Sequence, residues 1–267
     1  MISVCMATYN GERFIRQQLD SILPQLSSDD EIIVSDDGST DETLEILKSY
    51  KDSRIKIFHH ERNEDLLKEK AGRNFYLASS NFENAIKKSS GDYIFFADQD
   101  DEWMPDKIKK MVALLNANDC VHCSNVVIDE NSSLITDGLR AKKKSKKSVI
   151  YNLFWTPFLG CCMAVRRDAL KYILPFPKKC IGHDLWIGCL CAYKKSLAHI
   201  EEPLHRYRKH LNNVSPTLSK KSSNSICFMI KYRIHFLYYF YKRILTMAVP
   251  AGNHGRMTLT IRENILM

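Results

Sequence analysis

The sequence lacks a hydrophobic run long enough to cross a bilayer. Its most apolar segment, residues 226–249, is interrupted by Lys and Arg side chains, so no charge-free stretch approaches the roughly 20 residues that a membrane span needs. The first six residues, MISVCM, also lack the basic region and the long apolar core of a signal peptide. We therefore expect a cytoplasmic protein, and the composition does not fit a multi-span membrane protein.

A regular cysteine framework is also missing. The nine cysteines are odd in number, and the C-x-x-C pair of Cys120 and Cys123 has no second pair at a zinc-ribbon distance. We therefore expect buried, reduced thiols, as is usual in the cytosol, rather than disulfides or a structural zinc site.

The composition is that of an ordinary globular protein with an excess of positive charge. Hydrophobic residues make up 45% of the chain and charged residues 26%, which argues against disorder. Thirty-nine Lys and Arg against thirty-one Asp and Glu give a net charge of +8, which suggests an anionic partner such as a phosphate or a membrane surface. No recognition motif for nucleic acid accompanies the charge, so we expect no nucleic-acid partner.

Buried strands alternate with amphipathic helices in the first hundred residues. Apolar runs predict strands, and helical periodicity predicts the segments between them. The expected strands are Ile2–Ala7, Glu31–Ser35, Arg54–His59 and Tyr93–Ala97, and the expected helices are Glu12–Leu23, Glu42–Tyr50 and Lys68–Lys88. This alternation predicts an α/β fold with a mostly parallel, Rossmann-like sheet flanked by helices.

The stretch from Gly91 to Lys107, GDYIFFADQDDEWMPDK, is the most informative part of the chain. Its apolar run ends in acids, which places Asp98 and Asp100 at the carboxyl edge of a buried strand, where open α/β sheets bind ligands. Alternation along the backbone sends both carboxylates to the same side, so this D-x-D pair can bind one Mg²⁺ or Mn²⁺. An acidic loop without metal is the alternative. A helix is expected to follow, with Lys107 on its solvated face.

Other polar groups also lie at predicted element ends. Thr8 and Tyr9 follow the first strand, and Asp37 follows the second, so all three are expected at the same sheet edge. Asp184 lies at the start of a later helix, where it is either functional or simply an N-cap. A last strand is expected at His199–Pro203.

Two basic segments leave alternatives open. Residues 140–147, RAKKKSKK, form either a solvated loop or a phosphate clamp. Residues 226–249 form either a helix that lies on an anionic bilayer or a helix that packs on the domain with its basic residues outward. The sequence alone does not decide between these alternatives.

Together these motifs resemble glycosyltransferase family 2, and within it the bacterial rhamnosyltransferases and related polysaccharide glycosyltransferases. The resemblance spans about residues 2–215, and the order and spacing of its motifs are highly specific. The motifs are SVCMATYNGERFIRQQLDSIL (3–23), EIIVSDDGSTDET (31–43), NFENAIKKSSGDYIFFADQDDEWMPDK (81–107), GHDLW (182–186) and YRKHLNN (207–213).

The resemblance implies a GT-A fold and a sugar-transfer reaction. A nucleotide-sugar-binding half, residues 1–101, would be joined to an acceptor-binding half, residues 102–215, with a linker and a basic-aromatic helical tail at 216–267. The implied reaction is inverting, metal-dependent transfer of a sugar from a nucleotide-diphosphate donor, with Mn²⁺ or Mg²⁺ as cofactor. The Q-x-x-R-W signature of processive synthases is absent, which indicates one sugar per encounter.

The same resemblance assigns roles to nucleotide- and metal-binding positions. Thr8 and Tyr9 would hold the nucleoside, with Tyr9 stacked on the base, and Asp37 would accept a hydrogen bond from the base imide. Asp98 would face the ribose or the metal. Asp100 would be the principal metal ligand.

Two later positions complete the implied site. Asp184 matches the catalytic base of the family, although His183 precedes it where Glu is usual. His210 would be a further metal ligand or a diphosphate contact, and a solvated basic loop is the alternative for the segment around it.

The implied substrates are a dTDP-rhamnose or UDP-hexose donor and a lipid-linked or growing surface polysaccharide, of capsule or O-antigen type, at the inner membrane. A sugar nucleotidyltransferase is a competing interpretation, but it would need a Gly-rich phosphate loop where this chain has TYNGERF. A degenerate nucleotide-sugar-binding or membrane-docking module is another. The intact acids at the predicted site argue against it.

Overall fold

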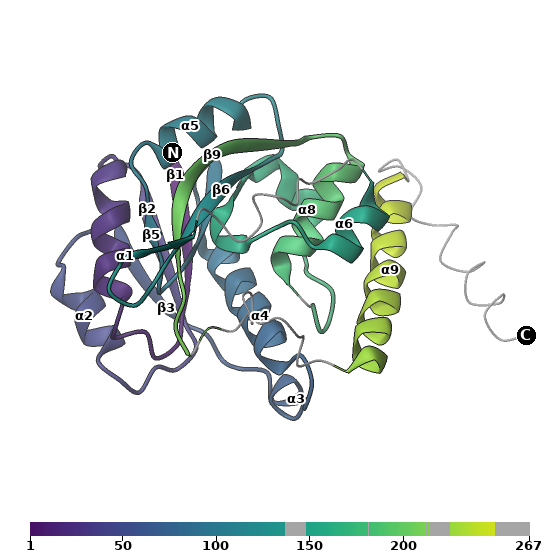
Figure 1. Ribbon diagram of the computed structural model, residues 1–267, viewed down its shortest axis with the longest axis horizontal. Coiled ribbons are helices and arrows are strands. Elements are labelled where there is room, and N and C mark those ends of the chain that lie inside the picture. Colours follow the sequence, from purple (N-terminus) through teal and green to yellow (C-terminus); the bar gives the residue numbers. More distant parts are fainter. Residues whose placement is uncertain (137–147, 181, 212, 214–224, 249–267) are drawn as a thin grey trace, which may run out of the picture.

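The computed structural model describes residues 1–136, 148–180, 182–211, 213 and 225–248, which form an α/β structure (Figure 1). Within these ranges one nine-stranded sheet has the order β3-β2-β1-β4-β8-β6-β9-β5, and β7 pairs with β6. The strands are β1 (Ile2–Thr8), β2 (Glu31–Asp36), β3 (Ile55–His59), β4 (Tyr93–Asp98), β5 (Glu102–Trp103), β6 (Cys120–Ile128), β7 (Leu134–Thr136), β8 (Met163–Arg166) and β9 (Leu197–Arg208).

Helices flank this sheet on both faces. They are α1 (Ile15–Ile22), α2 (Thr43–Ser49), α3 (Glu64–Leu67), α4 (Arg73–Lys88), α5 (Lys107–Leu115), α6 (Val149–Trp155), α7 (Leu170–Ile173), α8 (His183–Tyr193) and α9 (Ile226–Ala248). Three short 3-10 turns, Leu23–Gln25, Gly160–Cys162 and Arg167–Ala169, adjoin them. No helix in the described part of the chain is both long and apolar enough to cross a membrane.

Strands β1 to β4 form the predicted parallel half of the sheet. Their side chains alternate between two buried clusters: Val4 of β1 faces the cluster that holds Leu19 of α1, whereas Cys5 faces the cluster that holds Phe82 of α4. Helices on both faces bury β1, β2 and β4 almost completely, which is why these strands are unbroken or nearly unbroken apolar runs in the sequence, whereas the edge strand β3 is only partly buried. The α/β prediction is confirmed.

The second half of the sheet mixes directions. Strand β8 runs antiparallel to both β4 and β6, and β9 runs parallel to β6. The last strand was expected to end at Pro203, but β9 continues to Arg208. Its pairing with β6 shifts register around Ser124, which faces Pro203, so the proline lies where the ladder is already irregular and does not end the strand.

Two other sequence expectations are wrong in detail. The helix predicted from Lys68 begins only at Arg73, because Gly72 has a φ of 76° and breaks the helical path. Lys107 was expected on the solvated face of α5, yet its side chain is fully buried. The basic segment at 140–147 and most of the predicted linker before α9 lie outside the described residues.

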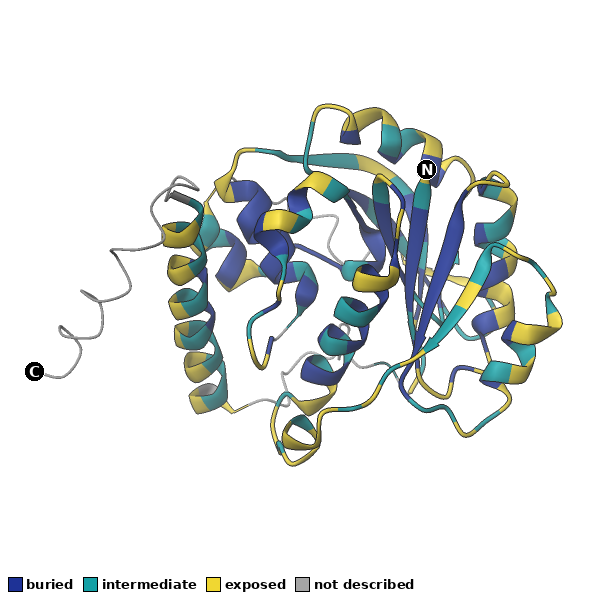
Figure 2. Ribbon diagram, turned by 180° about the vertical axis from the view of Figure 1, so that it is seen from behind, coloured by how far each residue is buried: buried dark blue, intermediate teal, exposed yellow. Residues whose placement is uncertain are grey.

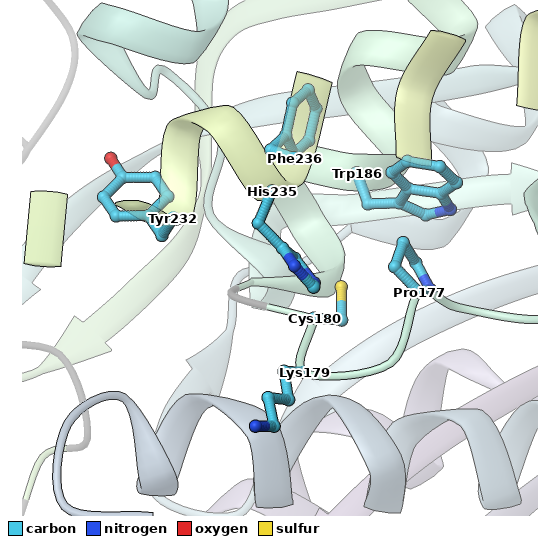
Figure 3. A pocket seen from close by; sticks show the side chains of 7 residues that line it. All are labelled: Pro177, Lys179, Cys180, Trp186, Tyr232, His235 and Phe236. Carbon is cyan, nitrogen blue, oxygen red and sulfur yellow. The ribbon is translucent and has the colours of Figure 1, made fainter. Parts of the chain in front are cut away.

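Helix α9 packs on the domain at one end of the molecule (Figure 1). Phe236 and Phe240 pack edge-on against Trp186 of α8, and Arg243 donates to the carbonyls of Leu174 (3.1 Å) and Pro175 (2.6 Å). A small pocket remains between α9 and the segment before α8, as Figure 3 shows. The packing alternative for this helix is therefore confirmed, although Arg243 points inward rather than outward.

The outer side of α9 remains exposed, as Figure 2 shows. It carries an unexpected set of large apolar residues, each at least 55% exposed, which we call the outer stripe: Ile230, Ile234, Tyr238, Tyr241 and Leu245. Their spacing of three and four residues places them on one face of the helix. The side turned away from the domain is thus apolar as well as basic.

Candidate active site

The turn after β1 and the turn after β2 meet at one edge of the sheet. The N–H of Asp37 donates to the carbonyl of Thr8 (2.9 Å), and the buried Thr8 hydroxyl donates to Asp36 Oδ1 (2.8 Å). The Tyr9 side chain, 45% exposed, stands beside them at the surface. The structure therefore brings Thr8, Tyr9 and Asp37 together.

Two basic side chains adjoin Asp37 and were not singled out in the sequence. His60 Nδ1 lies 2.5 Å from Asp37 Oδ1, and Arg62 Nε lies 3.3 Å from Asp37 Oδ2. The Arg62 guanidinium also covers the ring of Tyr9, with its carbon 3.7 Å from the ring centroid. Both come from the segment between β3 and α3, whose position at this edge depends on tertiary structure.

Gln99, the central residue of the D-x-D, links two strand ends. It accepts from the N–H of Tyr9 (2.8 Å) and donates to the carbonyl of Tyr9 (3.0 Å). Gly11 makes room for this contact, because a Cβ at that position would lie only 2.4 Å from Gln99 Oε1. The side chain between the two predicted metal ligands thus fixes the backbone of Tyr9, one of the predicted nucleotide-binding residues.

Asp98 and Asp100 lie at the end of β4 and just beyond it. Burial, followed by the charges of Asp101 and Asp100, raises the pKa of Asp98 well above its ordinary value. Burial also raises the pKa of Asp100, although His210 opposes the shift with its Nε2 2.7 Å from Asp100 Oδ2. Phe14 packs on the His210 ring, with 5.1 Å between centroids. The structure therefore joins His210 to the predicted metal ligand.

Asp101 belongs to a separate, fully buried network. Its Oδ2 lies 2.9 Å from His205 Nε2, and Lys107 Nζ lies 3.1 Å from His205 Nδ1. A lysine ammonium can only donate, so His205 Nδ1 accepts and the imidazole is neutral, with its Nε2–H donated to Asp101. Burial, with the charge of Lys107, accordingly lowers the pKa of His205 to about 4. Lys107 and Asp101 are thus the two charged ends of one buried series of hydrogen bonds that passes through His205.

Arg208, fully buried at the end of β9, also holds the acidic loop in place. Its backbone N–H donates to Asp101 Oδ1 (2.8 Å), and its Nε donates to the carbonyl of Asp100 (2.9 Å). Its other guanidinium nitrogens bond to Glu102 and to the turn that starts at Asp129. A solvated basic loop was the alternative for the segment that contains this arginine, but Arg208 is buried and anchors the acidic loop to the sheet.

Asp184 lies in the first turn of α8. The N-cap of this helix is Gly182, so the N-cap alternative for Asp184 is wrong, although its carboxylate accepts from the N–H of Leu185 (2.7 Å). The charge of Asp184 contributes, after burial and the two neighbouring acids, to the raised pKa of Asp98. The predicted catalytic base is therefore near enough to the acidic loop for its charge to act on Asp98.

His183 precedes Asp184 and is buried among aromatic rings. Its ring centroid lies 4.2 Å from that of Phe82 and 5.5 Å from that of Phe96, and burial lowers its pKa. Its Nε2 has no hydrogen-bond partner among the described residues. A Cβ on Gly160 would lie 2.4 Å from that nitrogen, so this histidine position requires glycine there.

The chemistry of these side chains fits a hard divalent cation. The carboxylates of Asp98 and Asp100 are crowded and partly buried, so each is more readily protonated than usual unless a positive charge balances it. Cys161 lies close to Asp98 and Asp101, and the pKa of its thiol is well above its usual value. The hydrogen bond to Cys162 lowers that pKa, but burial and the charges of Asp101 and Asp98 together raise it more. A neutral thiol leaves the oxygen ligands that Mg²⁺ and Mn²⁺ prefer.

Comparison with known proteins points in the same direction. Residues 3–174 match the family model described as "Glycosyl transferase family 2". The dTDP-rhamnosyl transferase RfbG of Shigella flexneri is 33% identical over 220 residues, which cover 78% of this chain and 72% of that protein. WfgD of Escherichia coli, a UDP-Glc:alpha-D-GlcNAc-diphosphoundecaprenol beta-1,3-glucosyltransferase, is 27% identical over 83% of this chain and 82% of its own.

Solved structures share the fold. TarS of S. aureus, residues 1–349 in complex with UDP-GlcNAc, has a TM-score of 0.65 and 18% identity, covering 93% of this chain and 68% of that one. Glucosyl-3-phosphoglycerate synthase of Mycobacterium tuberculosis, in complex with Mn²⁺, UDP and glucosyl-3-phosphoglycerate, has a TM-score of 0.54 and 22% identity, covering 90% and 79%. This similarity establishes the GT-A architecture of the chain.

Proposed function

Because the chain belongs to glycosyl transferase family 2, we propose that it transfers one sugar, with inversion, from a nucleotide-diphosphate donor to a hydroxyl of a saccharide acceptor. The observation that carries the proposal is that Gln99 of the D-x-D is bonded to Tyr9 at the edge where Thr8 and Asp37 lie, while the charge of Asp184 acts on Asp98. The sugar nucleotidyltransferase alternative is set aside by the family match.

The donor would lie along the carboxyl edge of the sheet. Tyr9 would stack on the base, with Thr8 beside it, and Asp37 would accept from a base N–H. Asp98 would face the ribose or the cation. The placement of Asp37 in a nearly buried position supports this role, because a hydrogen bond there is shielded from water.

Asp100, Asp98 and His210 would hold Mn²⁺ or Mg²⁺. When bound, the cation would neutralise the negative charge of the departing diphosphate. Asp100 would carry most of this binding, because its side chain is 18% exposed and its carboxylate is paired with His210 rather than with a lysine or arginine of the described residues. His210 would orient that carboxylate or join it as a ligand.

Asp184 would act as general base. Its carboxylate would accept the proton of the acceptor hydroxyl while that oxygen attacks C1 of the donor sugar, and the bond from C1 to the diphosphate oxygen would break. One carboxylate is sufficient for this reaction, since the leaving diphosphate needs charge neutralisation rather than a proton.

The proposed donors are dTDP-rhamnose or a UDP-hexose, and the proposed acceptor is a lipid-linked saccharide of a surface polysaccharide. RfbG, by its name, uses a dTDP-rhamnosyl donor, and WfgD, by its name, glucosylates a diphosphoundecaprenol-linked sugar. These names support the two substrate classes without choosing between the two donors.

The test is a screen of nucleotide sugars with Mn²⁺, followed by the Asp184→Asn variant with the donor that binds. This variant should keep donor affinity and lose roughly two to four decades of turnover, the usual range for a lost general base. If donor binding collapses together with turnover, Asp184 is structural. If no nucleotide sugar binds the parent protein, the proposed reaction is wrong.

We also propose that the protein docks on an anionic bilayer through the outer stripe of α9. Three exposed residues of the neighbouring α6, Ile150, Phe154 and Trp155, enlarge the apolar surface. The guanidinium of Arg233 in α9 lies 5.0 Å from the ring centroid of Phe154, so the two helices are in contact. Exposed apolar side chains on adjoining helices are typical of membrane or protein contacts.

Charge favours the bilayer over a second copy of the chain. Helix α9 contains no acidic residue, and the exposed side chains of Lys231 and Lys242 flank the outer stripe. Two such helices would bring like charges together, whereas anionic headgroups attract each cation by about 1 kcal/mol. Phe236 and Phe240 are buried in the core and take no part in this surface.

Vesicle binding tests this contact. The double variant Ile234→Ser, Tyr238→Ser should weaken binding to anionic vesicles by at least about tenfold, because both side chains bury their apolar surface in the interface. Leu134→Ser, which changes an exposed leucine on β7, is the matched control and should bind like the parent. A parent that ignores vesicles, or forms a dimer that the double variant abolishes, would overturn the proposal. Deleting α9 is unsuitable, since it would uncover Trp186.

A further inference from the structure

Arg62 occupies the place where the nucleobase is proposed to bind. Its guanidinium covers the Tyr9 ring at 3.7 Å, and its Nε lies 3.3 Å from Asp37 Oδ2. These are the two contacts that a base would make: stacking on the tyrosine and donation of an N–H to the carboxylate. We propose that Arg62 is a built-in substitute for the base, which an incoming nucleotide must displace.

The chemistry of the side chain suits this substitution. A guanidinium is planar, weakly hydrated and rich in donors, so it stacks on an aromatic face and pairs with a carboxylate as a pyrimidine ring with an imide N–H does. Asp37 is nearly buried, and without nucleotide its negative charge would otherwise depend on His60 alone among its side-chain contacts. Arg62 thus keeps the empty site electrically balanced.

The contact is poorly satisfied, which favours its exchange. Arg62 Nε is shielded from solvent but makes no hydrogen bond within the described residues, because its 3.3 Å approach to Asp37 lacks hydrogen-bond geometry. The neighbouring contacts are regular: His60 Nε2 lies 3.1 Å from the Ser80 hydroxyl, and the Asp37 N–H is bonded to Thr8. The arginine is therefore the weakly held member of this group.

The backbone around Arg62 is fixed, so the side chain itself must move. The N–H of His60 donates to the carbonyl of Asp36 (2.8 Å), and Asn63 caps α3 by accepting from the N–H of Asp65 (2.9 Å). Arg62 lies between these two anchors, with 22% of its side chain exposed to solvent. Rotation of the side chain toward water opens the Tyr9 face without moving β3 or α3.

The inference rests on the proposed nucleotide-sugar reaction and is tested by binding of UDP and dTDP with Mn²⁺. Arg62→Ala should bind both nucleotides about three- to tenfold more tightly, with most of the change in the association rate, because the competing contact is gone. Pyrophosphate with Mn²⁺, which has no base, should bind the variant and the parent equally. Arg62→Lys, which keeps the charge but not the planar group, should bind UDP and dTDP with affinities between those of Arg62→Ala and the parent.

Arg16→Ala is the matched control. The guanidinium carbon of Arg16 lies 5.6 Å from the ring centroid of Tyr50, so it makes the same kind of contact with a tyrosine outside the proposed site. This variant should leave nucleotide binding unchanged. Weaker binding of UDP by Arg62→Ala would show that Arg62 contacts the bound base and would overturn the inference. Equal binding by variant and parent would also overturn it. A parent that binds neither nucleotide would instead contradict the proposed reaction on which the inference rests.

Discussion

Asp100 and Asp101 are neighbours in the chain but lie in opposite surroundings. Asp100 faces the open side of the acidic loop, where burial raises its pKa and the His210 ring contacts its carboxylate. Asp101 faces the sealed side. There its pKa is lowered, because burial, which raises it, is outweighed by His205 and by the N–H of Arg208.

The difference separates two uses of a carboxylate. On the sealed side every charge has a partner inside the protein, so the network holds the loop in place. On the open side the negative charge is incompletely balanced, which leaves it available to a cation from solution. One strand end thus divides two adjacent acids between an anchor in the interior, Asp101, and a proposed metal ligand at the partly exposed side, Asp100.

The largest effect should come from Asp101→Asn. The amide would turn a donor toward either His205 Nε2–H or the Arg208 N–H, and Lys107 would lose its buried counter-charge. We expect a loss of roughly 3–5 kcal/mol in the free energy of unfolding, measured by urea denaturation. Asp100→Asn is the matched control and should change stability by less than about 1 kcal/mol. Similar losses in both variants would contradict the distinction between a structural Asp101 and an Asp100 that is not needed for stability.

The sealed network should also make stability depend on pH. His205 has a pKa of about 4 in the folded protein against 6.5 ordinarily, so its contribution is complete above pH 6.5 and is lost as the pH falls to about 4. That difference corresponds to about 3 kcal/mol. Urea denaturation between pH 7 and 4 should show a smaller pH slope for His205→Gln than for the parent. Equal slopes would mean that His205 is protonated in the folded state.

On the open side, Asp100→Asn should weaken donor binding in Mn²⁺ by about a hundredfold, or roughly 2.7 kcal/mol. A neutral amide cannot replace a carboxylate between a divalent cation and a diphosphate. Calorimetry with the donor, with and without Mn²⁺, measures the effect. The loss should vanish without metal, and an unchanged affinity in Mn²⁺ would exclude Asp100 as the principal ligand.

The smallest effect should come from His210→Gln, with about a tenfold loss of donor affinity in Mn²⁺. The amide can still bond to Asp100, so the carboxylate keeps part of its orientation. The same titration serves as the readout. If the loss is as large without metal, His210 contacts the diphosphate rather than the cation or its ligand.

The sequence was sufficient to predict one side of this comparison. The apolar strand before Asp98 and the alternation of the D-x-D define the open edge, because both signals are local. The parallel strands Ile2–Thr8 and Glu31–Asp36 were predictable for the same reason. A feature that depends on one strand and its end is visible in a short stretch of residues.

The sealed side could not be predicted in this way. Asp101 and His205 are 104 residues apart, and their contact depends on a strand that continues past Pro203. Lys107 was placed on the solvent side because lysine is rarely buried without a partner, and its partner His205 lies on the distant strand β9. Arg62 was missed similarly, since nothing near it in the sequence indicates that it reaches Tyr9.

Helix α9 has one further consequence. Its inner side holds the segment that leads to Asp184, through Arg243 at the carbonyl of Pro175 and through Phe236 against Trp186. Its outer side is the proposed bilayer contact, and a helix with its side chains is about 10–12 Å across. Under that docking, the helix would act as a spacer that sets the height of the proposed catalytic base, Asp184, above the lipid surface. The enzyme would then select, from saccharides anchored in the membrane, the sugar that stands at that height.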